Sequence, residues 1–144
     1  MITAEDDLLG HATADSHSAS TASQVIRPAI PDTDRAMFTE RYWYMGALLP
    51  AGDMVFSAGL GYYVNRKIMD GFAGVTLNGR QHAYCASRHS GSDPLTPTIG
   101  ALRIEIEEPL RVHRIVLEPN ESSLRMDLRF TASLPINDEG RDLV

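Results

Sequence analysis

The 144-residue chain is acidic, with a formal net charge of −6. Its length suffices for one domain with a hydrophobic core. Residues 1–24 hold four acidic residues and no Lys or Arg, and residues 137–144 hold three acidic residues and one Arg. The body between these ends is neutral and has no basic stripe, which argues against nucleic acid or an anionic membrane as the main partner.

These composition shifts predict three segments. Residues 1–24 are rich in Ala, Ser, Thr and Asp, and we expect a disordered acidic arm there. A β domain is expected over residues 25–136, followed by a polar tail over residues 137–144. His11 and His17 lie in the arm without the spacing of metal ligands, so no metal site is predicted.

The single cysteine, Cys85, cannot form an internal disulfide and indicates a reducing compartment. The first residues lack an early positive charge and an apolar run typical of a signal peptide. No apolar stretch approaches the length of a transmembrane helix. We therefore expect a cytoplasmic protein.

The strongest local signal is the hairpin centred on Asn78-Gly79, because both residues tolerate the positive φ of a type I′ turn. This turn fixes the register of the two strands that it joins. The predicted cross-strand pairs are Leu77 with Arg80, Val75 with His82, Ala73 with Tyr84, and Phe72 with Cys85.

The preceding strand, over residues 54–64, alternates regularly. Its even-numbered positions form an apolar face, whereas Gly59 and Gly61 lie on the other face beside Tyr63. Two glycines on one face predict a shallow trough that a ring or another backbone can approach closely. The occupant is either a side chain of this protein or an apolar ligand. The Gly59-Leu60-Gly61 run lacks the third glycine and the following helix of a dinucleotide site, so no cofactor is predicted.

The rest of the chain continues in short strands separated by turns. Residues 41–49 form an aromatic and apolar run, and residues 102–107, 110–117 and 124–130 follow the hairpin. This pattern predicts an all-β antiparallel up-and-down meander, closed as a lipocalin-like barrel or packed as a half-barrel or sandwich. One core is expected to take the alternating residues Leu102, Ile104, Ile106, Leu124, Met126, Leu128 and Phe130.

Candidate chemistry is sparse. His82 and Tyr84 share one face of the hairpin, and with Asp70 they form a weak candidate set for acid–base work or ligand orientation. A Ser–His–Asp set built from Ser57 or Ser87 with His82 and Asp70 has no nucleophile elbow, and we do not favour it. Cross-strand polar pairing is the simpler role for these residues.

Other residues have simpler predicted roles. Trp43 is the only tryptophan, and packing in the core is favoured over stacking on a ligand. Cys85 is expected to be buried beside Phe72 and inert. Arg80 and Arg88 bracket a strand and are expected to be solvated. The residues predicted to line a ligand site are Trp43, Gly59, Gly61, Tyr63, His82 and Tyr84.

Four stretches carry a family resemblance: GLGYYVNRKIMDGFAG, NGRQH, the run from ASRHSGSDPLTPTIG to VLEPNESS, and MDLRFTASLPI. Over roughly Asp34 to Leu143 the chain resembles the N-terminal domain of bacterial lipocalin-like two-domain β proteins. Those proteins are similar to the carotenoid 1,2-hydratase (hydroxyneurosporene synthase) superfamily. The resemblance implies two packed β domains that handle apolar small molecules in or between them. Only one such domain is expected here, and no hydratase residue can be matched position by position.

Three functions remain open from the sequence. The first is a module that binds a small apolar ligand, isoprenoid- or lipid-like. The second is an enzyme that hydrates, isomerises or cyclises such a ligand, and the third is an interaction domain without a ligand site. Because one domain of a two-domain architecture would expose an apolar surface, we expect a homo-oligomer or docking of a second domain.

Overall fold

The computed structural model describes residues 39–48, 53–63, 66–90 and 96–135. They form eight strands: β1 (Glu40–Ala47), β2 (Met54–Tyr63), β3 (Ile68–Leu77), β4 (Arg80–His89), β5 (Thr98–Ile99), β6 (Leu102–Glu108), β7 (Val112–Leu117) and β8 (Met126–Thr131). The expected acidic arm and polar tail lie outside the described residues.

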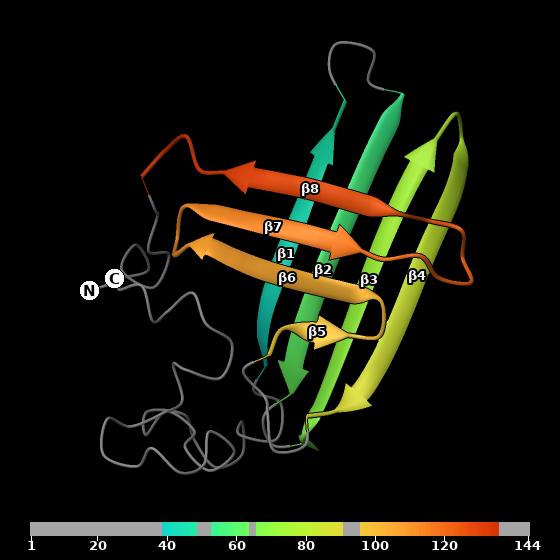
Figure 1. Ribbon diagram of the computed structural model, residues 1–144. Helices are drawn as coiled ribbons and strands as arrows, with labels where there is room; N and C mark the ends of the chain where they lie inside the picture. Colours follow the sequence, from blue (N-terminus) through green and yellow to red (C-terminus); the bar gives the residue numbers. More distant parts are fainter. Residues whose placement is uncertain (1–38, 49–52, 64–65, 91–95, 136–144) are drawn as a thin grey trace, which may run out of the picture.

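The strands form two antiparallel sheets, each with its strands in sequence order. One sheet contains β1 to β4 and the other contains β5 to β8. The second sheet lies across one face of the first, with its strands crossing those beneath it (Figure 1). Within the described residues the sheets stay open and do not close into a barrel. The all-β meander is thus confirmed in its half-barrel or sandwich form.

The hairpin predicted at Asn78-Gly79 is present, with φ of 50° and 72° at these two residues. All four predicted cross-strand pairs between β3 and β4 occur, including Ala73 opposite Tyr84 and Phe72 opposite Cys85. The turn therefore sets which side chains share a face throughout this half of the molecule.

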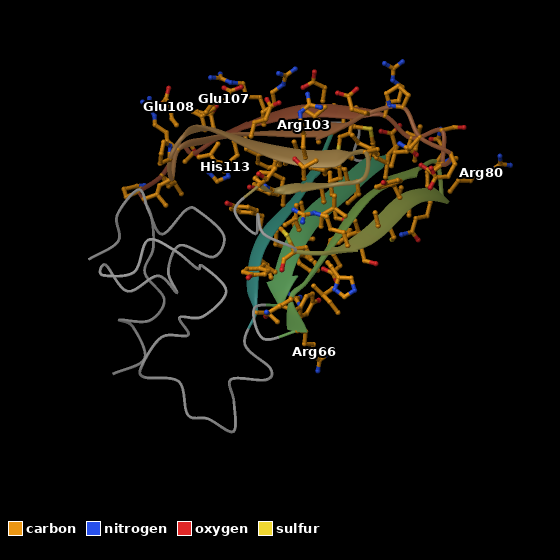
Figure 2. The ribbon with its side chains drawn as sticks, turned by 60° about the horizontal axis from the view of Figure 1, so that its bottom comes forward. Arg66, Arg80, Arg103, Glu107, Glu108 and His113 are labelled. Carbon is orange, nitrogen blue, oxygen red and sulfur yellow. The ribbon has the colours of Figure 1, made fainter. Side chains whose placement is uncertain are left out.

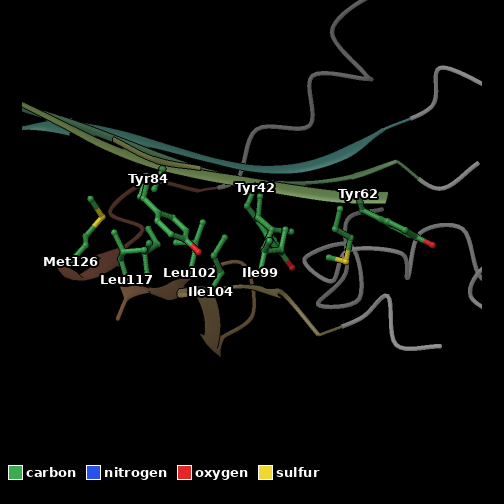
Figure 3. Close-up of a cluster of buried hydrophobic side chains, with 13 residues drawn as sticks. Tyr42, Tyr62, Tyr84, Ile99, Leu102, Ile104, Leu117 and Met126 are labelled. Carbon is green, nitrogen blue, oxygen red and sulfur yellow. The ribbon is translucent and has the colours of Figure 1, made fainter. Parts of the chain in front are cut away.

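The core lies between the two sheets. Tyr42 and Tyr84 point from the first sheet toward the apolar side chains of the second, and Tyr62 is buried at the end of the same cluster (Figure 3). The alternating residues predicted from the second sheet all belong to this core, although Ile106, Leu124, Leu128 and Phe130 are only partly buried. The space that a lipocalin would leave for its ligand is filled here by the protein's own side chains.

Two polar contacts tie the sheets together inside this core. The backbone N–H of Ala101 donates a hydrogen bond to the Tyr84 hydroxyl at 2.9 Å. The Tyr44 hydroxyl lies 2.6 Å from Nδ1 of His113, on the inner side of β7. Figure 2 shows His113 on the side of its sheet that faces the other sheet, and Glu107 and Glu108 on the outside.

The outer face of the β5–β8 sheet is charged, because Arg and acidic residues alternate with the core residues along its strands. Arg114 binds the Asp127 carboxylate with two hydrogen bonds of 2.8 Å, and it also lies 3.4 Å from Glu105. Arg103 pairs with Glu105 at 2.7 Å, and Arg129 pairs with Glu107 at 2.7 Å. These ion pairs link β6, β7 and β8 across a surface that remains in water.

Candidate functional site

A groove lies on the outer face of the β1–β4 sheet, on the side away from β5–β8. Its volume is about 520 Å³. It crosses β1, β2, β3 and β4 near the middle of the sheet and toward the start of β1. The side chains that line it on the outer face are Arg41, Trp43, Tyr63, Asp70, Phe72, Cys85 and Ser87, around a floor of Gly59 and Gly61.

The two glycines of β2 form a site of close approach, as predicted. A Cβ atom on Gly59 would lie 2.7 Å from the Phe72 ring, and one on Gly61 would lie 2.8 Å from Oδ1 of Asp70. Cβ atoms do not approach other groups so closely, so both positions require glycine or a shift of these neighbours. The nearest occupants of the trough are therefore the protein's own Phe72 and Asp70, and the groove is the space that remains above and between them.

An aromatic pair forms one wall. Trp43 and Phe72 pack edge to face, with ring centroids 5.2 Å apart. Trp43 is 56% exposed. The expectation that this tryptophan packs in the core is wrong, because alternation along β1 turns Trp43 outward while Tyr42 enters the core. Trp43 lies instead beside the trough formed by Gly59 and Gly61. This position agrees with the prediction that Trp43, Gly59 and Gly61 line one ligand site.

The end of the groove nearest the start of β1 is polar. The Tyr63 hydroxyl donates a hydrogen bond to Oδ2 of Asp70 at 2.9 Å, and the Arg41 guanidinium donates to the Tyr63 hydroxyl at 3.4 Å. The hydrogen bond to Asp70, then partial burial, raise the pKa of Tyr63 above its usual value of 10.0. The phenol therefore stays protonated and keeps its donor directed at the carboxylate.

Cys85 is exposed and forms no disulfide. The prediction that it is buried is wrong for the same reason as for Trp43. Its pairing with Phe72 is as predicted, but both side chains point to the outer face, which the second sheet does not cover. The thiol lines the groove and is accessible to solvent.

The structure does not bring the three weak catalytic candidates together. Tyr84 is buried in the core, where its hydroxyl is held by Ala101. Asp70 lines the groove on the opposite face of the sheet, and His82 is exposed near the β3–β4 turn. Of the predicted ligand-site residues, Trp43, Gly59, Gly61 and Tyr63 meet in the groove, whereas His82 and Tyr84 do not.

The two arginines of β4 differ in role. Arg80 is exposed, as expected, at the turn end of the sheet (Figure 2). Arg88 is half-buried, and its guanidinium donates hydrogen bonds to the carbonyls of Thr98 at 2.9 Å and of Ser90 and Thr96 at 3.1 Å. The expectation of a solvated Arg88 is therefore wrong, since the side chain holds both described ends of the connection between the two sheets.

Sequence reasoning missed Arg41, Asp70, Phe72, Cys85 and Ser87 as groove residues. The pairing of β2 with β3 could have identified them. Gly59 pairs with Phe72 and Gly61 pairs with Asp70, so Phe72 and Asp70 lie on the same outer face as the two glycines. Cys85 and Ser87 extend the same rows onto β4. Extending the alternation from the hairpin to β2 groups these side chains with the glycine trough.

The described residues offer neither a metal site nor a membrane span of the helical kind. Among them no three His, Cys, Asp or Glu side chains are grouped as metal ligands would be. His11 and His17 lie outside those residues. The described part of the chain also contains no helix of the length and apolar character needed to cross a membrane.

Comparison with known proteins gives one finding. The model of a family of unknown function (DUF8625) matches residues 15–144. No curated protein and no solved structure matches the chain. The family match covers both sheets and the whole groove. The chain belongs to this family, DUF8625.

Proposed function

We propose that the protein is a binding module whose groove on the outer face of the β1–β4 sheet holds a small apolar ligand. The observation that carries the proposal is the pairing of a glycine floor with an exposed aromatic wall, Trp43 and Phe72. Phe72 and Asp70 lean over the two glycines, so a ring or polyene chain would lie in the space above and between them, against the aromatic wall. The groove's 520 Å³ is within the usual range of small-molecule sites.

The polar end indicates how such a ligand would be oriented. Arg41 offers hydrogen-bond donors and Asp70 offers an acceptor, with the Tyr63 hydroxyl between them, all at one end of an otherwise apolar groove. An elongated ligand with one polar terminus fits this arrangement, with its hydroxyl or carboxyl group at Arg41 and its apolar body on Trp43. An isoprenoid or lipid-like molecule, the class implied by the resemblance to the carotenoid hydratase superfamily, has this form.

The enzyme alternative finds no support in the described residues. His82 is exposed near the turn, Tyr84 is buried, and Asp70 lies on the opposite face, so the three cannot act on one substrate. The interaction alternative is favoured by the filled core, but the groove gives the outer face a specific hollow as well. Binding therefore accounts for more of the structure than either alternative.

The exposed thiol of Cys85 further supports our proposal of a cytoplasmic protein.

Retinol titration followed by Trp43 fluorescence tests the proposal. Trp43 is the only tryptophan in the chain and lies in the wall of the groove, so retinol bound there should quench its emission strongly. We expect saturable quenching as retinol occupies the groove. Emission that falls only linearly with added retinol, as with collisional quenching, would contradict binding at this site.

A matched pair of substitutions on β4 locates the site. Ser87 lines the groove, whereas Gln81 is exposed on the same outer face near the turn and does not. Ser87→Phe places a ring in the groove and should weaken retinol binding at least about tenfold, the equivalent of about 1.4 kcal/mol. Gln81→Phe adds the same ring elsewhere and should leave binding unchanged. Equal effects of the two variants would place the ligand outside the groove.

A further inference from the structure

We infer that the groove is half of a site and that a second copy of this chain supplies the other half. In this arrangement the outer faces of two β1–β4 sheets pack against each other. The role given to the ligand rests on the proposed function. The contact between copies rests separately on the distribution of charge and on the register of the strands.

The groove leaves a ligand poorly covered. It lies on an open sheet face, and its aromatic wall is exposed, with Trp43 at 56%. Small-molecule sites usually bury about 70–90% of their ligand. A ligand lying on this sheet keeps one side in water unless something covers it.

The two outer faces of the molecule differ sharply in charge. On β6, β7 and β8 most outward positions carry Arg or an acidic residue, and ion pairs join these charges. On β1–β4, the outward positions of the described strands carry only two charged residues, Arg41 and Asp70. The remainder are small, polar or apolar, and the exposed apolar ones include Trp43, Met45 and Val55. Protein interfaces differ from ordinary surface in having few charged residues at their centre.

The register arranges this face in rows that are symmetric about β2. Arg41 and Asp70 flank Gly61, and Trp43 and Phe72 flank Gly59. In the next outward row Met45 and Gly74 flank Ser57. Each row thus places a small residue in the middle, with β1 and β3 side chains about 5 Å to either side.

This symmetry specifies how a second copy would fit. A two-fold axis running along β2, above the glycines, exchanges the positions over β1 and β3. Arg41 of each copy then lies over Asp70 of the other, so both charges are paired across the contact. Trp43 faces Phe72, and Met45 faces Gly74, which leaves room for its side chain. The face is complementary to itself in charge and in shape, as a two-fold contact requires.

Sedimentation velocity of the full chain without ligand tests the contact. We expect a dimer at micromolar concentrations. Met45→Glu places a charge in the contact outside the groove and should weaken dimerisation at least about tenfold. Thr131→Glu, on the exposed outer face of β8, is the matched control and should leave the dimer intact. A wild-type chain that stays monomeric up to about 100 µM overturns the inference.

Charge exchange tests the axis. Arg41→Asp and Asp70→Arg should each be monomeric, because like charges then face each other twice. An equal mixture of the two variants should restore a dimer, since every facing pair is again opposite in charge. Circular dichroism checks that both variants are folded. A mixture of folded variants that remains monomeric contradicts the pairing.

Retinol binding separates this inference from the proposed function. If the second copy completes the site, monomeric Met45→Glu should bind retinol more weakly than the wild type, although its own groove is unchanged. Equal binding by monomer and dimer overturns the role of the second copy and leaves the proposed function standing. Absence of binding to the wild-type dimer overturns the proposed function and leaves the contact between copies standing.

Discussion

At the scale of single residues, Tyr63 links the two charges of the groove. Its hydroxyl donates to Asp70 at 2.9 Å and accepts from Arg41 at 3.4 Å. Only the protonated phenol can donate to the carboxylate, so ionisation of Tyr63 breaks this link and places a second negative charge beside Asp70. The hydrogen-bonded arrangement of Arg41, Tyr63 and Asp70 therefore requires Tyr63 to be protonated.

The pH dependence follows from the direction of this shift. The pKa of Tyr63 in the folded protein is above the usual 10.0. Its contribution to stability is thus fully present below about pH 10, and it is lost as the pH rises through the folded-state pKa. We expect Asp70→Asn to lower the pKa of Tyr63, because the carboxylate that favours the protonated phenol is removed.

Tyrosinate absorbance as a function of pH measures this effect, and subtracting the titration of the matching Tyr63→Phe variant isolates the contribution of Tyr63. Asp127→Asn is the control, because it removes a carboxylate from the outer face of the other sheet and should leave the pKa of Tyr63 unchanged. The same pKa of Tyr63 in the wild type and in Asp70→Asn would show that the hydrogen bond does not control the ionisation.

At the scale of strands, Phe130 connects β8 to the first sheet. Its ring centroid lies 5.0 Å from that of Tyr44 and 5.8 Å from that of Phe56. Phe130 is only partly buried. Phe130→Ala should therefore destabilise the protein by about 1–3 kcal/mol, less than the roughly 3–5 kcal/mol typical of a fully buried Phe.

Urea unfolding measures the loss, and Leu134→Ala is the control. Leu134 is 79% exposed, so its truncation should change the free energy of unfolding by less than about 0.5 kcal/mol. Equal effects of the two substitutions would show that Phe130 does not join β8 to the first sheet.

The hairpin shows how much of the strands could be predicted from the sequence. A two-residue turn and a period of two residues suffice to pair Ala73 with Tyr84 and Phe72 with Cys85. They do not state which face of the hairpin a second sheet covers. The prediction of a buried Cys85 fails for that reason, because the covered face depends on how β5–β8 crosses the first sheet.

The candidate site was predictable to a similar degree. The glycine trough and Tyr63 follow from alternation along β2 alone. Trp43 joins them only once β1 is known to pair with β2, which places it beside Gly59. The prediction groups Tyr84 with Asp70 because they lie on neighbouring strands, whereas the hairpin register sets Asp70 on the opposite face. The face on which a side chain lies decides membership of this site more than the nearness of its strand does.

At the scale of the molecule, the two sheets expose different surfaces. The β5–β8 sheet presents ion pairs to water, and the β1–β4 sheet presents glycine, alanine, serine and aromatic side chains with charges at one end. A charged surface of this kind keeps a protein in solution, whereas an uncharged one favours contact. We therefore propose the outer face of β1–β4 as the binding surface.

The rate of alkylation of Cys85 tests this assignment most directly. Cys85 is the only cysteine of the chain, it is exposed, and it lines the groove, so its modification by a maleimide reports on this face alone. With retinol at about ten times its dissociation constant, we predict that the rate falls about tenfold, in proportion to the unoccupied fraction of the site. An unchanged rate under conditions where retinol quenches Trp43 would show that the ligand does not lie in the groove, and would contradict the assignment.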